Sequence, residues 1–172
     1  MAMGRILLMS PERVRRTLRR LAAEILERNR GADTLEIIGI RHRGYQLAAA
    51  LADLINQAEG ASLRALPLDV APYRDDRATP ARPPEPPLEA DLNDRDVILV
   101  DDVLFTGRTA RAALDAIVHA GRPRSIQLVV LIDRGHREYP IQPTYVGRVI
   151  PTKHRERVVV EAEEGFAVYL EE

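Results

Sequence analysis

The sequence predicts an α/β fold in one domain of 172 residues, with a central, mostly parallel sheet flanked by helices. A fully apolar run, Val97–Val100, and a second strand with the pattern of a buried one, Ile126–Ile132, enclose a predicted helix at about Thr109–Ala120. Strands that are apolar on both faces and alternate with helices are typical of a parallel sheet covered on both sides. A chain of this length buries enough surface to fold without cross-links.

Composition excludes several classes of protein. The chain has no cysteine, which excludes a disulfide framework, thiolate metal sites and a cysteine nucleophile. No apolar run approaches the ~18 residues of a membrane span, and Ile6–Met9 is too short for a signal-peptide core. We therefore expect a cytoplasmic protein with no membrane partner. Net charge is −1, so the chain as a whole is not a general polyanion binder.

Lys153 is the only lysine, and every other cationic side chain that is always charged is an arginine. Two explanations stay open. Arginine binds phosphate with a planar fork that lysine lacks, or the abundance reflects a GC-rich genome.

The N-terminal half is expected to contain two helices and two strands. Ser10-Pro11-Glu12 predicts a helix start, because serine caps, proline suits the first position and glutamate opposes the dipole. Apolar residues then recur at helical spacing up to Gly31. A short strand at Glu36–Ile40, a helix at Tyr45–Glu59 and another strand at Leu63–Val70 follow.

Residues 71–91 differ from the rest of the chain. Six of the 12 prolines lie between Pro72 and Pro87, and almost no apolar side chain accompanies them. A segment of this length without regular structure is usually either a functional lid or a flexible surface excursion. Its start, Tyr73–Asp76, can form a mobile hairpin arm.

Three strands are expected toward the C-terminus, at Val146–Ile150, Arg157–Ala162 and Phe166–Leu170. The last two are predicted to form a hairpin around Glu163-Glu164-Gly165.

The segment that carries chemistry starts at the end of the apolar strand Val97–Val100. Asp101 and Asp102 follow it directly, and ligands of open α/β sheets bind at the carboxyl ends of strands. A turn with Thr106 and Gly107 then opens into a helix, whose free N–H groups and dipole suit a phosphate. Acceptors for hydroxyls, or for hydroxyl-bound Mg²⁺, beside a phosphate site fit a ribose 5-phosphate.

Other interpretations of this segment are weaker. Asp101 and Asp102 can merely cap a helix. The turn partly matches the end of a nucleoside-triphosphate loop, but the earlier glycine and the lysine are missing, and no G-x-G-x-x-G follows a strand.

The segment resembles the 5-phosphoribosyl 1-pyrophosphate (PRPP) signature of type I phosphoribosyltransferases. Further runs narrow the resemblance to the PyrR family of pyrimidine operon attenuators and uracil phosphoribosyltransferases. These runs are Tyr73-Arg74-Asp75-Asp76, Gly121-Arg122-Pro123, Asp133-Arg134-Gly135-His136-Arg137-Glu138 and Ile150-Pro151-Thr152. The resemblance implies the type I phosphoribosyltransferase fold, with a small hood and a flexible arm at about 71–91.

The resemblance also implies site residues. The two acids would bind the ribose hydroxyls, and the following turn would bind the 5-phosphate. The residues implied for catalysis and PRPP binding form one continuous stretch: Asp101, Asp102, Val103, Leu104, Phe105, Thr106, Gly107, Arg108 and Thr109. The residues implied for pyrophosphate binding come from two segments and are Arg41, His42, Arg43 and Arg74. The base meets the hood at Ile132, Asp133 and Arg134. Taken alone, Arg41 and Arg43 fit either a site for a dianionic leaving group or a solvated turn.

The implied reaction converts uracil and PRPP to UMP and pyrophosphate, with Mg²⁺ held mainly by PRPP oxygens and water rather than by direct protein ligands. A homodimer is expected from the family. Phe105 stands where the family usually has tyrosine, and it cannot act as the aspartate general base of purine-specific relatives. His42 replaces a usual threonine, and Ala71-Pro72 replaces Thr-Leu.

The resemblance further implies UMP-dependent binding to the mRNA leader of a pyrimidine operon. Four basic residues are candidates for this contact: Arg19, Arg137, Arg148 and Lys153. Arg19, Ala23 and Gln142 depart from the family pattern, so these cations can instead form an ordinary solvated or subunit-facing surface. A phosphoribosyltransferase without an RNA role, or one acting on another base, remains the alternative.

Overall fold

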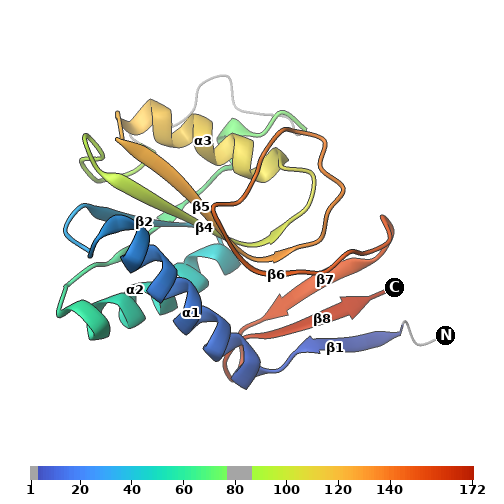
Figure 1. Ribbon diagram of the computed structural model, residues 1–172. Coiled ribbons are helices and arrows are strands. Elements are labelled where there is room, and N and C mark those ends of the chain that lie inside the picture. The colour runs from blue at the N-terminus through green and yellow to red at the C-terminus, as the bar shows by residue number, and fades with distance from the viewer. Residues whose placement is uncertain (1–3, 77–86) are drawn as a thin grey trace.

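A five-stranded parallel sheet forms the centre of the computed structural model, which describes residues 4–76 and 87–172 (Figure 1). The strand order is β3-β2-β4-β5-β6, and all four neighbouring pairs are parallel. The strands are β2 (Leu35–Ile40), β3 (Ala65–Leu68), β4 (Asp96–Leu104), β5 (Ser125–Asp133) and β6 (Tyr145–Val149). The predicted parallel sheet is confirmed.

Three helices cover the two faces of this sheet: α1 (Pro11–Asn29), α2 (Arg43–Glu59) and α3 (Arg108–Ala120). Ser10 caps α1 as predicted, because its hydroxyl accepts the N–H of Arg13 at 3.3 Å. The helix ends with Arg30 in the left-handed conformation, and the N–H of Gly31 then donates to the carbonyl of Leu26. No helix in the described ranges has both the length and the apolar composition of a membrane span.

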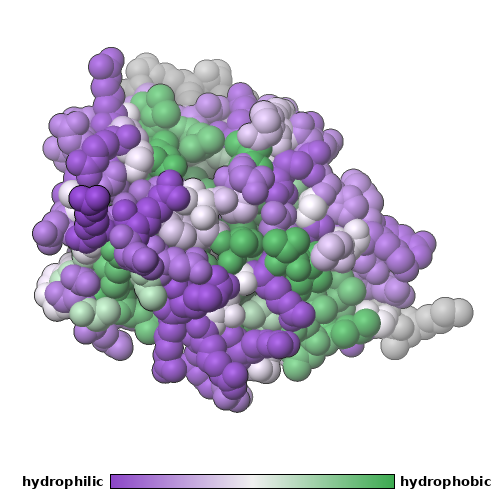
Figure 2. All heavy atoms as spheres, viewed as in Figure 1, coloured by the Kyte–Doolittle hydropathy of each residue, from purple (hydrophilic) through white to green (hydrophobic). Residues whose placement is uncertain are grey.

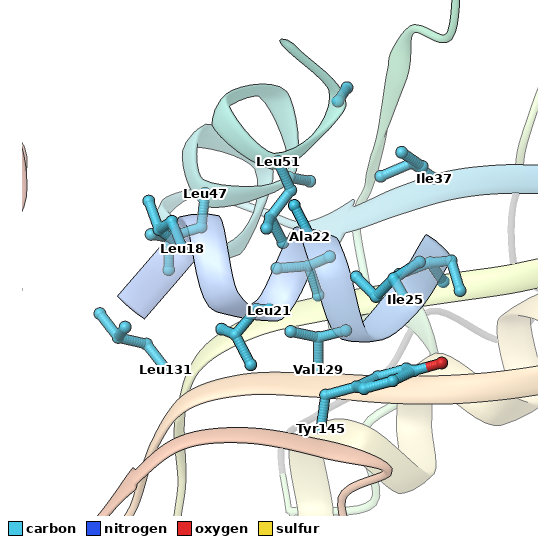
Figure 3. Close-up of a cluster of buried hydrophobic side chains, with 14 of the residues drawn as sticks. Leu18, Leu21, Ala22, Ile25, Ile37, Leu47, Leu51, Val129, Leu131 and Tyr145 are labelled. Atoms are coloured by element: carbon cyan, nitrogen blue, oxygen red, sulfur yellow. The ribbon is translucent and has the colours of Figure 1, made fainter. Parts of the chain in front are cut away.

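Alternate residues of the strands serve two hydrophobic clusters. Ile37, Ile98 and Val129 point to the face of α1 and α2, whereas Ile38 and Leu99 point to the face of α3. On the first face, apolar residues of the two helices pack together over β5 and the start of β6 (Figure 3). The near-continuous apolar pattern of β4 follows from this two-sided burial.

A second, three-stranded antiparallel sheet contains β1 (Arg5–Met9), β8 (Ala167–Glu171) and β7 (Arg157–Glu161), in that order. The predicted β7–β8 hairpin is confirmed. The sequence predicts no strand at β1, because Ile6–Met9 is a short continuous apolar run and lacks the alternation that marks a half-buried strand. In the structure Ile6 and Leu7 are both exposed. Figure 2 shows apolar atoms gathered at the lower right, where β1 lies in Figure 1.

The predicted arm is attached to the body of the protein at both ends. Ala71–Tyr73 forms a short 3₁₀ turn that packs beside α3, not a strand. After the other end of the segment, Leu92 is fully buried, and Leu88 within it is 6% exposed, both in the cluster beneath α3. The rest of the predicted hairpin, 77–86, lies outside the described residues.

Candidate functional site

Two adjacent carboxylates lie at the carboxyl end of the central strand. The strand β4 continues four residues past the predicted end at Val100, so Asp101 and Asp102 belong to it. An Asp101 carboxylate oxygen accepts the N–H of Asp102 at 2.8 Å, and an Asp102 oxygen accepts the N–H of Val103 at 2.8 Å. These bonds orient both side chains while leaving most of their acceptor capacity unused.

The electrostatic setting of this pair favours the binding of donors. Burial of the Asp101 carboxyl, followed by the adjacent Asp102 carboxylate, raises the pKa of Asp101 well above its ordinary value, and Arg74 offsets only part of this. Among the described residues neither acid forms an ion pair within 4.0 Å, and no group of three metal-ligating side chains is found. Hydroxyl donors or a cation brought by a ligand would relieve the repulsion.

A turn with little side-chain capping follows the acids. Gly107, in the left-handed region at φ +90°, caps α3 without a side-chain hydrogen bond. A Cβ there would lie 3.1 Å from the side chain of Ile141, which is a tight contact, so the space at this position favours glycine together with the positive φ. Residues 138 and 139 donate their N–H groups to the carbonyl of Thr106 at 2.9 and 3.0 Å. The Thr106 hydroxyl accepts the N–H of Arg108 at 3.3 Å. The supported turn and the N–H groups of the following residues at the start of α3 are features that an anion site requires.

Close packing brings the cationic turn Arg41-His42-Arg43 beside the acids. A Cβ at Gly44 would lie 2.5 Å from the carbonyl oxygen of Val100 and 3.3 Å from the Asp101 carboxylate. The first turn of α2 therefore abuts the end of β4. Arg41 and His42 are exposed, the peptide bond between them is cis, and Arg43 already belongs to α2, two residues before the predicted start.

Arg74 reaches the same region from a distant part of the chain. Its guanidinium donates to the hydroxyl of Thr109 at 2.8 Å and forms a two-pronged pair with Asp76 at 2.8 and 2.7 Å. The structure therefore brings Arg74 to the turn at the start of α3.

The predicted hood residues lie at the end of β5, and their side chains are buried and contact other residues of the protein. Ile132 is fully buried. Asp133 is buried, which opposes its ionisation, yet a bond from Arg137 at 2.7 Å and one from the Gly135 N–H keep its pKa below the ordinary value. The Arg134 guanidinium donates to Thr152 at 2.9 Å and lies 4.0 Å from the centroid of the Phe105 ring.

Sequence reasoning missed a cluster of rings around Phe105. His136 and His154 lie 5.5 and 5.3 Å from it, centroid to centroid, and 5.4 Å from each other. His136 also hydrogen-bonds the carbonyl of Thr152 at 2.6 Å. No motif unites these residues, since three different loops supply them.

The four candidate RNA contacts differ in their surroundings. Arg19, Arg148 and Lys153 are exposed. Arg137 is not, because its guanidinium donates to the carbonyls of Ile141 and Phe105 at 2.9 and 3.0 Å and to Asp133. A guanidinium with partners on three sides fastens the loop after β5 and has few donors left for RNA. The role of Arg137 as an RNA contact stays a prediction.

Comparison with known proteins agrees with this geometry. The family model described as phosphoribosyl transferase domain matches residues 10–163. Two solved structures share the fold at low identity. A hypoxanthine phosphoribosyltransferase of Staphylococcus aureus has a TM-score of 0.68 at 22% identity, covering 86% of this chain and 79% of that one. A hypoxanthine-guanine phosphoribosyltransferase of Bacillus anthracis has 0.70 at 17%, covering 98% of each chain. The chain belongs to the phosphoribosyltransferase class, with the type I fold.

Curated relatives narrow the assignment. A protein of Deinococcus radiodurans named bifunctional protein PyrR is 51% identical over 160 residues, which is 91% of this chain and 87% of the relative. Its namesakes in Limosilactobacillus reuteri (51% over 156 residues; 88% of each chain) and Clostridium kluyveri (48% over 162; 92% and 90%) are similar. Within the class, the chain belongs to the PyrR family.

Proposed function

We propose that the protein transfers the 5-phosphoribosyl group of PRPP to uracil, forming UMP and pyrophosphate. The observation that carries the proposal is the Asp101–Asp102 pair, which forms no ion pair within 4.0 Å among the described residues and adjoins the start of α3, where Gly107 supplies no side-chain cap. Ribose hydroxyls need paired acceptors and a 5-phosphate needs free N–H donors. The stretch Asp101–Thr109 supplies both over a short distance.

Within this proposal, the two acids bind the ribose hydroxyls and the turn Thr106–Thr109 binds the 5-phosphate. Hydrogen bonds from the hydroxyls would stabilise the charged form of Asp101, whose pKa burial raises. Gly107 allows the backbone to approach the phosphate closely.

The leaving pyrophosphate is assigned to Arg41, His42, Arg43 and Arg74. Negative charge grows on this group as the bond to the anomeric carbon breaks, so preorganised cations and donors lower the barrier. Arg74 supports this assignment because it already contacts Thr109. The remaining residues of the turn adjoin Asp101 through the packing of Gly44.

Phosphoribosyltransferases generally use Mg²⁺ with PRPP, and the residues here fit that use. Mg²⁺ prefers oxygen ligands and retains waters and substrate phosphates around one or two carboxylates. PRPP oxygens and water would hold the ion, while Asp101 and Asp102, which form no ion pair in the described ranges, would bind the ribose hydroxyls beside it. Bound Mg²⁺ would supply charge neutralisation at the pyrophosphate oxygens.

The base is assigned to the region of Phe105. The Phe105 ring offers a stacking face for the base, and the Arg134 guanidinium lies over the ring. Arg134 would therefore act on the base through Phe105. Phenylalanine carries no general base, which favours a pyrimidine over the purines of the structural neighbours.

The test is UMP formation from labelled uracil, PRPP and Mg²⁺, with hypoxanthine, guanine and cytosine as competing bases. We expect uracil-selective turnover in the wild type. Turnover with another base only, or no turnover together with no PRPP binding, would overturn the proposal.

A second function is favoured by the family and by the exposure of Arg19, Arg148 and Lys153. We propose that the protein also binds the mRNA leader of a pyrimidine operon in a UMP-dependent way, as a cytoplasmic homodimer. Shape and phosphate contacts dominate such recognition. A gel shift with leader RNA, with and without UMP, tests it: binding that UMP strengthens is expected. Absence of binding at every UMP concentration would leave a phosphoribosyltransferase without an RNA role.

A further inference from the structure

A hydrogen-bonded cluster joins three separate segments beside the proposed phosphate turn. The Tyr139 hydroxyl, in the loop after β5, donates to one carboxylate oxygen of Asp75 at 2.5 Å. The Arg108 guanidinium, in the first turn of α3, donates to the other oxygen at 3.1 Å and to the Tyr139 hydroxyl at 3.0 Å. Arg108 also lies over the Tyr139 ring, 4.9 Å from its centroid. Tyr139 lies outside the runs that carry the resemblance, and Asp75, which belongs to the run Tyr73–Asp76, is assigned no role in the site.

The cluster bears directly on the placement of Arg74. Asp75 contacts Arg108, and the preceding residue, Arg74, contacts Thr109. Two consecutive side chains are therefore bound to two consecutive residues of α3. The backbone at this point is held by Asp75, and the guanidinium of Arg74 extends from it toward the turn. Arg74 also pairs with Asp76, which lies on the same segment and would move with it. Loss of the Asp75 contacts would therefore release this segment from α3 and leave the Thr109 bond as the side-chain contact between Arg74 and the turn.

The charges of the cluster agree with this arrangement at neutral pH. The Tyr139 hydrogen bond, opposed by burial and assisted by Arg108, lowers the pKa of Asp75, while the Asp75 bond raises the pKa of Tyr139. Asp75 is then the ionised acceptor and Tyr139 the protonated donor. Two other charged groups face them, Arg111 at 3.9 Å from Asp75 and Glu138 at 3.8 Å from Arg108.

We propose that Tyr139 and Asp75 are positioning residues for Arg74, which they hold at the start of α3 in the orientation that receives the pyrophosphate of PRPP. The inference rests on the proposed function of the site. Preorganisation of a cation avoids the loss of side-chain freedom on binding, and its benefit is expressed in the affinity for that ligand.

The test is Tyr139→Phe, which removes the hydroxyl but keeps the ring beneath Arg108. We expect the KM for PRPP to rise about tenfold, the size of a lost hydrogen bond to a charged group, with the KM for uracil unchanged. Tyr169→Phe is the matched control, since it removes a tyrosine hydroxyl from β8, in the small sheet. Its KM for PRPP should equal that of the wild type.

A double-variant cycle separates positioning from a general loss of structure. In an Asp75→Asn background, Tyr139→Phe should have less than a twofold further effect on the KM for PRPP, because the shared contact is already weakened. Equal effects in both backgrounds, or an unchanged KM in Tyr139→Phe alone, would overturn the inference. Chemical denaturation of each variant establishes that it is folded.

Calorimetric titration of PRPP distinguishes failure of the positioning inference from failure of the proposed function. If the wild type binds PRPP without turnover, the affinity of Tyr139→Phe replaces KM as the readout, with the same tenfold expectation. If the wild type binds no PRPP, the proposed function and this inference both fail. Equal PRPP affinity of wild type and Tyr139→Phe overturns the inference alone.

Discussion

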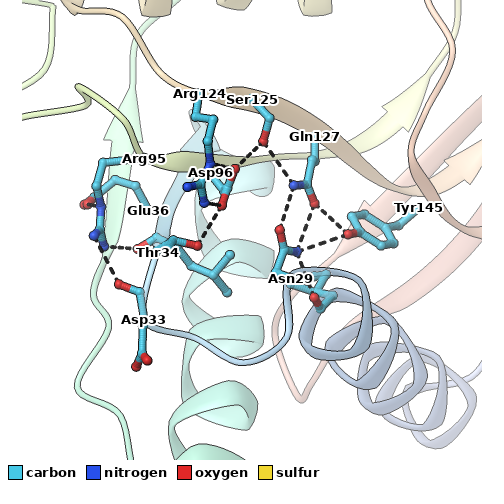
Figure 4. A network of polar contacts seen from close by, with 12 residues as sticks. Asn29, Asp33, Thr34, Glu36, Arg95, Asp96, Arg124, Ser125, Gln127 and Tyr145 are labelled. Atoms are coloured by element: carbon cyan, nitrogen blue, oxygen red, sulfur yellow. Dashed lines mark hydrogen bonds and ion pairs between the residues drawn. The ribbon is translucent and has the colours of Figure 1, made fainter.

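The strand β4 has one aspartate at its first position and two more toward its carboxyl end, and the two ends differ in what surrounds these carboxylates. Asp96, at the first position, accepts hydrogen bonds from Thr34 at 2.6 Å, from Ser125 at 2.7 Å and from the guanidinium of Arg124 (Figure 4). The Arg124 bond chiefly, against some burial, lowers the pKa of Asp96. This carboxylate has its partners within the protein.

The other end of the strand lacks such partners. Asp101 receives one backbone N–H and faces Asp102, and the result is a pKa shifted in the opposite direction. An aspartate of β4 thus stabilises the fold where the protein supplies hydrogen-bond donors. Where the protein supplies few donors, the aspartate can accept them from a ligand. A perturbed carboxylate at the carboxyl end of a parallel sheet indicates function because its cost is not offset in the free protein.

The largest effect is expected at the carboxyl end. Replacing Asp101 and Asp102 together by asparagine should reduce UMP formation by roughly a thousandfold or more, because oriented charge at the reacting group is lost. The fold should persist, since an asparagine side-chain oxygen can still accept the N–H groups of Asp102 and Val103 in β4. Steady-state turnover and circular dichroism are the measurements, and undiminished turnover would remove these acids from the site.

The reverse pattern is expected at the other end of the strand. Asp96→Asn should lower the free energy of unfolding by about 1–2 kcal/mol, a value reduced by the exposure of Arg124 to solvent. Turnover at a temperature where the variant is folded should stay within twofold of the wild type, since no contact of Asp96 reaches the site. Urea denaturation and UMP formation measure the two quantities, and a large loss of kcat in a folded variant would break the comparison.

The two ends should also respond to pH with opposite signs. Asp96 has a lowered folded pKa, so its contribution is present above the unfolded value of about 3.9 and is lost as pH falls below it. Asp101 has a raised folded pKa, so the folded state holds a proton that the unfolded state releases, and stability falls as pH rises above about 4.

Denaturation of the two asparagine variants at a series of pH values reads out these slopes. Asp96→Asn should lose the acid-side dependence, whereas Asp101→Asn should gain stability over the wild type as pH rises toward neutrality. If the free energy of unfolding of either variant differed from that of the wild type by the same amount at every pH, the opposite pKa shifts of Asp96 and Asp101 would be contradicted.

The smallest effect is expected from a single donor to Asp96. Ser125→Ala removes one neutral hydrogen bond and should lower the free energy of unfolding by about 0.5–1 kcal/mol. Turnover should not change. A destabilisation as large as that of Asp96→Asn would mean that Ser125 acts mainly through its other neighbour, Gln127, 3.2 Å away.

The parts of the fold that the sequence predicts correctly are those with a local signal. The apolar run before Asp101 marks a central strand, and Ser10-Pro11 marks a helix start, so the order of strands and helices follows from short windows. The acids and the threonine-glycine turn are adjacent in the sequence, which is why their proximity was predictable.

The remainder depends on contacts between distant segments. The strand β1 exists because it pairs with β8 at the other end of the chain. Arginine is usually a surface residue, and only the structure shows that the Arg137 guanidinium donates to carbonyls of two loops. The Tyr139–Asp75 contact joins residues 64 positions apart, and no periodicity in either segment encodes it.

The most direct test of the functional assignment of the two ends is calorimetric titration of PRPP with Mg²⁺ into three proteins at neutral pH: the wild type, Asp96→Asn and the Asp101→Asn/Asp102→Asn double variant. We expect equal affinity in the first two proteins and loss of measurable binding in the third. Binding of PRPP by the double variant with wild-type affinity would contradict the assignment of Asp101 and Asp102 to the ligand.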